Sequence, residues 1–171
     1  MKCILTLFFL ISVNAFSQSS FYQLSLSTSP DSISLQQFTG QRILIACVTP
    51  DSLGEDGVQY FDSLQHVYSD LQVIVMPIMD LGGDSNIAVF NHLHDLPASF
   101  IWAMPAFAQD TDSTVQDPVI RWLTRIETNT HFNVNINRSQ VFVVSALGDL
   151  YAVLNDGFRN QVLSDILQQQ P

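Results

Sequence analysis

Few side chains in this sequence could act as a nucleophile. Cysteine occurs only at Cys3 and Cys47, and Cys47 lies inside the apolar run Ile-Leu-Ile-Ala-Cys-Val that ends at Val48. A reactive thiol needs a base or a helix N-terminus beside it, whereas a thiol within an apolar run behaves as a small core residue. We therefore interpret Cys47 as a core residue and keep a displaced reactive thiol as the alternative.

Serine and histidine give weaker signals. Ser52 lacks the Gly-x-Ser-x-Gly elbow of a hydrolase nucleophile, and no His or Asp partner stands at an informative spacing from it. We interpret Ser52 as a loop or helix-capping residue. His92 and His94 are two residues apart, a spacing that places them on different faces of a helix and makes them poor joint metal ligands.

Two acidic segments have parts of a cation-binding pattern. Residues 110–114 (Asp-Thr-Asp-Ser-Thr) match the start of a calcium loop, but Val115 stands where that loop needs glycine and Arg121 where it needs glutamate. We interpret them as an acidic surface loop. Asp80 and Asp84 flank two glycines, and a helix cap at Asp84 explains them better than a weak cation site does. The sequence therefore predicts no metal and no cofactor.

Charge and the N-terminal segment restrict the class of partner and the compartment. The formal net charge is −10, which disfavours nucleic acid and anionic membranes. Lys2, an apolar core and small residues before Ser17 form the pattern of a secretory signal peptide, with cleavage after Ala15 or Ser17. We expect a periplasmic or secreted protein, with no membrane span after cleavage and with Cys47 as its single thiol, so that no internal disulfide can form.

Hydrophobic patterns downstream of the signal predict one α/β domain over residues 18–171. Residues 42–48 and 71–76 are continuous apolar runs joined through a helix, which favours two parallel strands buried on both faces. The last two strands favour a hairpin across Gly148. This order is typical of a thioredoxin-like mixed sheet flanked by helices. The expected strands are 32–35, 42–48, 71–76, 141–144 and 150–154, and the expected helices are 58–68, 84–94, 117–126 and 162–167.

Several of these segments, in this order, resemble the glutathione peroxidase family. The resemblance covers roughly residues 22–168 and implies the family's thioredoxin-like fold. In that family one strand leads to the peroxidatic cysteine, a second ends in Phe-Pro before a glycine pair, and a Trp-Leu helix precedes the final hairpin. The matching segments here are residues 40–48, 73–86, 104–105, 117–124 and 142–151.

The family's catalytic residues are not retained under this resemblance. It places Ser52 at the nucleophile position and Asp80 at the glutamine position, and the Trp-Asn pair falls on either Ile136-Asn137 or Asn137-Arg138. A hydroxyl cannot replace the thiolate that attacks a peroxide, because its pKa is far too high and oxygen forms no sulfenic acid. Asp80 adds negative charge where an anion must be stabilised. The positions of resolving cysteines are also empty.

Two hypotheses follow from these residues. The first is a non-catalytic member of the family that serves as a binding or structural domain. The second is an enzyme: a thiol peroxidase that reduces hydroperoxides through Cys47 in an oxidative-stress response, or an unrelated activity in the old site. We favour the first. The sequence identifies no partner, and a protein is one candidate.

Overall fold

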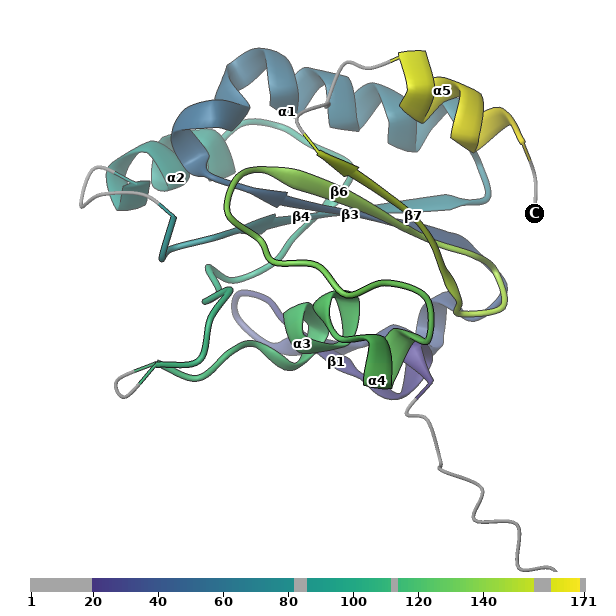
Figure 1. Cartoon of the computed structure of the whole chain (residues 1–171). Helices are drawn as coiled ribbons and strands as arrows, with labels where there is room; N and C mark the ends of the chain where they lie inside the picture. The colour runs from purple at the N-terminus through teal and green to yellow at the C-terminus, as the bar shows by residue number, and fades with distance from the viewer. Residues whose placement is uncertain (1–19, 82–85, 112–113, 156–160, 170–171) are drawn as a thin grey trace, which may run out of the picture.

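The computed structural model describes residues 20–81, 86–111, 114–155 and 161–169 (Figure 1). The predicted signal peptide (residues 1–17) with its cleavage positions, and the predicted cap at Asp84, lie outside the described residues. No helix in the described ranges is long and apolar enough to cross a membrane.

A five-stranded mixed sheet forms the centre of the fold, in the order β5-β4-β3-β6-β7. Strand β3 pairs in parallel with β4 and antiparallel with β6, and β6 and β7 form a hairpin. The predicted parallel pair and hairpin are thus confirmed. The strands are β3 (Arg42–Val48), β4 (Leu71–Pro77), β5 (Ile101–Trp102), β6 (Gln140–Val144) and β7 (Leu150–Asn155).

Helices α1 (Pro50–Val67), α2 (Asn86–His94) and α5 (Gln161–Gln168) cover one face of the sheet. The other face carries α3 (Pro118–Thr124), α4 (Ile126–Asn129) and a small hairpin of β1 (Ser25–Ser27) and β2 (Ser32–Ser34), with 3-10 turns at Phe21–Gln23 and Leu35–Phe38 (Figure 1). Both sides of β3 are buried, which explains its continuous rather than alternating hydrophobicity.

Three differences from the expected elements have local causes. Helix α1 begins at Pro50 rather than near residue 58, because Gly54, with φ +60° and ψ 174°, links a first turn to the longer helix. The expected helix 117–126 divides after Thr124, since Arg125 has an extended backbone. Strand β5 has two residues, too few for a periodic signal.

Asp117 begins α3 as predicted. Its carboxylate accepts hydrogen bonds from the backbone N–H groups of Val119 and Ile120, and Pro118 occupies the first helical turn. The cap fixes where α3 begins, beneath the sheet in Figure 1. Thr124, at the far end of that helix, lines a polar cavity.

Candidate functional site

The carboxyl ends of β3 and β4 meet the start of β6 beside the first turn of α1. In parallel α/β sheets this edge is the usual place for ligands. Ser52 lies here, exposed, in the first turn of α1. The hydrogen bonds at this edge bear on function, because the resemblance places the family's nucleophile at Ser52.

The Ser52 hydroxyl is fully occupied by hydrogen bonds. Its Oγ accepts from the Thr49 hydroxyl at 2.8 Å and lies 2.5 Å from the Ser139 Oγ, and its own proton goes to the Thr49 carbonyl at 2.9 Å. The Ser139 Oγ also accepts from the Thr49 N–H at 3.1 Å. One donor and two acceptor positions exhaust a serine hydroxyl. Because the proton is given to a carbonyl and not to a base, Ser52 is held but not activated.

Cys47 is a core residue of β3. Its side chain has 0% exposure and belongs to the cluster that includes Trp122 and Ile120. Burial in apolar surroundings, with a smaller contribution from the Asp117 carboxylate, raises the pKa of the Cys47 thiol far above its ordinary value. The thiol is therefore neither accessible nor ionised in the folded protein.

The two residues that the resemblance offered for the family's asparagine lie outside the Ser52 hydrogen bonds. Asn137 and Arg138 are both exposed, and the Arg138 Nε lies 3.4 Å from the Asn137 Oδ1. Ser139 contacts Ser52 instead. Sequence reasoning missed Ser139, because the register that pairs Cys47 with Gln140 across β3 and β6 brings it to Thr49, and no local pattern encodes that register.

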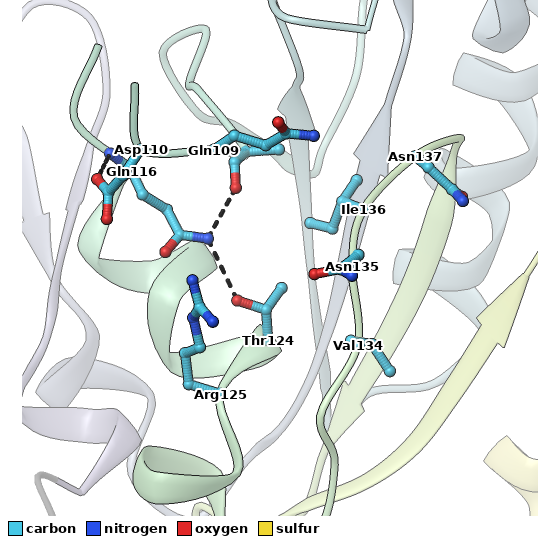
Figure 2. A pocket seen from close by; sticks show the side chains of 10 residues that line it. Gln109, Asp110, Gln116, Thr124, Arg125, Val134, Asn135, Ile136 and Asn137 are labelled. Carbon is cyan, nitrogen blue, oxygen red and sulfur yellow. Dashed lines mark hydrogen bonds between the residues drawn. The ribbon is translucent and has the colours of Figure 1, made fainter. Parts of the chain in front are cut away.

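A polar cavity of about 460 Å³ lies beside the segment that leads into β6 (Figure 2). A second cavity, of about 360 Å³, shares Val134, Asn135 and Asn137 with it. The first cavity is enclosed by the loop after β5, the end of α3 and the segment before β6. Its lining is Ala108, Gln109, Asp110, Gln116, Thr124, Arg125, Val134, Asn135, Ile136 and Asn137.

Gln116 is the buried polar residue of this cavity, with 4% exposure. Its Nε2 donates to the Ala108 carbonyl at 2.7 Å and to the Thr124 Oγ1 at 3.3 Å (Figure 2). Its Oε1 is buried and has no hydrogen-bond partner. No sequence pattern pointed to this residue, since an isolated glutamine in a loop has no signature.

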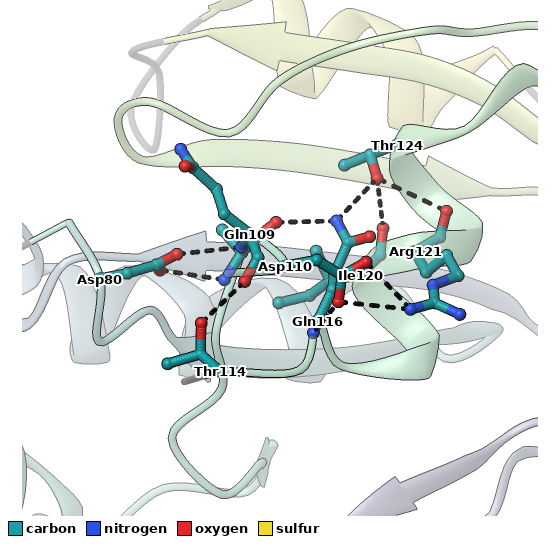
Figure 3. Close-up of polar contacts among 9 residues, drawn as sticks. Asp80, Gln109, Asp110, Thr114, Gln116, Ile120, Arg121 and Thr124 are labelled. Atoms are coloured by element: carbon teal, nitrogen blue, oxygen red, sulfur yellow. Dashed lines mark hydrogen bonds and ion pairs between the residues drawn. The ribbon is translucent and has the colours of Figure 1, made fainter. Parts of the chain in front are cut away.

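Asp80 organises the wall of the cavity (Figure 3). Its carboxylate accepts hydrogen bonds of 2.9 Å from the backbone N–H groups of Ala108 and Gln109. Among the described residues Asp80 makes no hydrogen bond or ion pair with Ser52 or its partners. The resemblance gives Asp80 the family's glutamine position, and in the structure its carboxylate tethers the loop at residues 108–109.

The Asp110 carboxylate, the first acidic residue of the segment that partly matches a calcium loop, is paired with Arg121. The Asp110 carboxylate accepts from the Gln116 N–H at 2.6 Å and forms an ion pair with Arg121 at 3.1 Å (Figure 3). A guanidinium thus stands near a carboxylate that would otherwise be available to a cation. Asp112 lies outside the described residues.

The histidines do not form a metal centre in the described part of the chain. His92 lies 3.2 Å from the Glu55 carboxylate, and His94 packs against the rings of Phe90 and Trp102. No group of three or more His, Cys, Asp or Glu side chains among the described residues is placed to hold a metal ion.

Comparison with known proteins supports the fold. The apo form of Trgpx superimposes with a TM-score of 0.66 at 14% sequence identity, covering 90% of this chain and 99% of that chain. The fold is the glutathione-peroxidase form of the thioredoxin fold. T. cruzi GPX1 is similar, with a TM-score of 0.58 at 14% identity over 87% of this chain and 94% of that chain.

The glutathione-peroxidase-like fold also relates the chain to more distant thioredoxin-like proteins. MTB dsbF has a TM-score of 0.52 at 10% identity, covering 86% of this chain and 95% of that chain. No protein-family model matches the sequence, and no curated protein matches it. At identities this low, the structural superpositions establish a shared fold only. Activity has to be argued from the residues of the site.

Proposed function

We propose that this chain is an exported, glutathione-peroxidase-like protein whose domain binds a ligand or partner instead of reducing peroxides. The observation that carries the proposal is the hydroxyl of Ser52 at the position that the resemblance gives to the peroxidatic residue. Its proton is donated to the Thr49 carbonyl, and its remaining positions are filled by Thr49 and Ser139.

Peroxide reduction by this fold needs a chalcogen. A thiolate or selenolate attacks one peroxide oxygen, the O–O bond breaks, and the sulfur or selenium is oxidised to an acid that a second thiol reduces. A serine oxygen cannot undergo that oxidation. The loss of the nucleophile therefore removes the reaction even where the fold is retained.

The alternative nucleophile, Cys47, is disfavoured by its surroundings. Its sulfur has no exposed surface, and the burial that shields it from peroxide also disfavours the thiolate. It belongs to the same buried cluster as Trp122 and Ile120. Turnover through Cys47 would require the core to open.

Export is part of the same proposal. The pattern of residues 1–17 supports it. The one cysteine beyond that segment is compatible with an oxidising compartment, because a lone buried thiol cannot form an internal disulfide. The similarity to Trgpx and T. cruzi GPX1 supports the glutathione-peroxidase-like fold in this proposal.

Peroxide consumption tests the proposal. The purified protein is supplied with hydrogen peroxide or an organic hydroperoxide, and with glutathione or a thioredoxin system as the reductant. We expect a rate indistinguishable from that of a Cys47→Ala variant and from buffer with the reductant alone. Turnover above those backgrounds that is lost in Cys47→Ala would establish the thiol peroxidase instead.

A further inference from the structure

The cavity between the loop after β5, the end of α3 and the segment before β6 has two unsatisfied groups of opposite kind. One is a buried hydrogen-bond acceptor and the other is a cation. Both lie in the lining that Figure 2 shows, and neither takes part in the Ser52 hydrogen bonds. Together they restrict the chemistry of a ligand more than the volume of the cavity does.

The acceptor is the Oε1 of Gln116. The side-chain amide cannot turn to satisfy it, because its Nε2 is held by the Ala108 carbonyl and the Thr124 hydroxyl oxygen. The Thr124 hydroxyl cannot donate to it either, since that proton goes to the Ile120 carbonyl at 2.8 Å. A buried acceptor without a donor carries a desolvation cost that a ligand N–H would recover.

The cation is Arg125. Its guanidinium makes no hydrogen bond or ion pair with the described residues, whereas Arg42 and Arg121 each pair with a carboxylate. In a chain with 6 basic and 16 acidic residues, an unpaired arginine at a cavity is a specific attraction for an anion. Guanidinium groups bind carboxylates through paired N–H donors.

We propose that this cavity binds a zwitterionic α-amino acid. Arg125 takes the carboxylate, and the ammonium group donates to the Gln116 Oε1 and is attracted by the Asp110 carboxylate on the same wall. The amide of Asn135 faces the remaining part of the ligand (Figure 2). A cavity of about 460 Å³ is in the range of small-molecule sites.

Binding requires one adjustment. The Gln116 oxygen is shielded from solvent, and the Arg125 guanidinium points toward the Gln116 carboxamide in Figure 2. Arg125 is exposed and unpaired, so its long side chain can move onto the ligand carboxylate and admit the ammonium group. The inference rests on the proposed function, because it supplies a ligand class for a domain that binds.

The inference is tested by heteronuclear NMR titration of the protein without its predicted signal peptide. Each standard L-amino acid is added singly at millimolar concentration. We expect at least one amino acid to shift the amide signals of residues 108–110, 116, 124–125 and 134–137. Arg125→Gln should weaken that binding by about 10-fold or more, the value of a charge-assisted contact. Glu127→Gln, which changes the charge by the same amount in the opposite direction two residues away and outside the cavity, should change it by less than about twofold.

Further probes separate the chemistry of the two ends of the ligand. The N-acetyl form of the amino acid that binds, and its deaminated analogue with a hydrogen in place of the ammonium group, keep the carboxylate and lack the ammonium group, so both should bind at least about 10-fold more weakly. Gln116→Met, with its folding checked by circular dichroism, should weaken the amino acid but not the deaminated analogue. Equal binding of the acetylated form, an unchanged affinity in Arg125→Gln, or no localised shift with any amino acid would overturn the inference.

The outcome is independent of the peroxide assay. A protein that turns over peroxide through Cys47 would refute the proposed function whatever the titration gives. If the protein shows neither peroxidase activity nor amino-acid binding, only the assignment of an amino-acid ligand to this cavity is refuted.

Discussion

A cysteine placed at residue 52 is expected to react with hydrogen peroxide at least about 100-fold faster than the native Cys47 thiol. Residue 52 is exposed, whereas Cys47 reacts only when the strands of the core open, and opening of a core strand costs several kcal/mol. The Ser52→Cys substitution is made in a Cys47→Ala background. The rate of sulfenic acid formation, followed by mass spectrometry, is compared with that of the wild-type thiol.

The same variant reports on the hydroxyl groups around residue 52. Thr49 and Ser139 both lie within hydrogen-bond distance of the Ser52 oxygen and can donate to a thiolate placed there. Hydrogen bonds to the charged form lower a pKa, so the new thiol should titrate below the ordinary value of about 8.5. Adding Ser139→Ala should raise that pKa. A thiol as slow as Cys47, or a pKa insensitive to Ser139→Ala, would contradict the geometry of this site.

Asp70→Asn is expected to lower the free energy of unfolding by about 2–3 kcal/mol. Arg42, with 4% exposure, donates to both Asp70 carboxylate oxygens at 2.7 and 2.9 Å and to the Leu167 carbonyl of α5 at 2.6 Å. Removing the carboxylate charge leaves a buried cation with incomplete compensation, and the half-exposed position of Asp70 keeps the cost below that of a fully buried pair. Urea unfolding measures the difference, with exposed Asp31→Asn as the control.

The pH dependence of that difference has a fixed sign. The hydrogen bond from Arg42 is the main cause that lowers the pKa of Asp70 in the folded protein. Its stabilisation is therefore complete above the unfolded carboxyl pKa of about 4 and is lost as the pH falls through the lower folded value. The gap between wild type and Asp70→Asn should narrow below about pH 4. A gap that is constant with pH, or that widens in acid, would show that the ion pair does not stabilise the fold.

The elements that the sequence predicted best are those whose signal is local. Strands β3 and β4 are continuous apolar runs, and the Asp117-Pro118 cap has the chemistry of a helix start. Strand β5 and the early start of α1 were missed. A two-residue strand has no period, and Gly54 allows the chain to turn into the helix earlier than its apolar spacing indicates.

The site was less predictable than the fold, because tertiary register decides it. Ser52 could be named from the resemblance, but its partner Ser139 depends on how β6 pairs with β3. The role of Asp80 as a tether depends on a loop 28 residues later in the chain. Gln116 and Arg125 have no sequence signature, since what they share is a group in one cavity, the Gln116 Oε1 and the Arg125 guanidinium, that no described residue pairs with.

Single-turnover oxidation of Cys47 tests whether this domain works as a thiol peroxidase. The signal-free protein is mixed with equimolar hydrogen peroxide, quenched at intervals and analysed by mass spectrometry, with Cys47→Ala and urea-unfolded protein as controls. Because Cys47 is buried, we expect the thiol to stay reduced while the protein is folded and to be oxidised once the protein is unfolded. Rapid, stoichiometric sulfenic acid at Cys47 in the folded protein would contradict it.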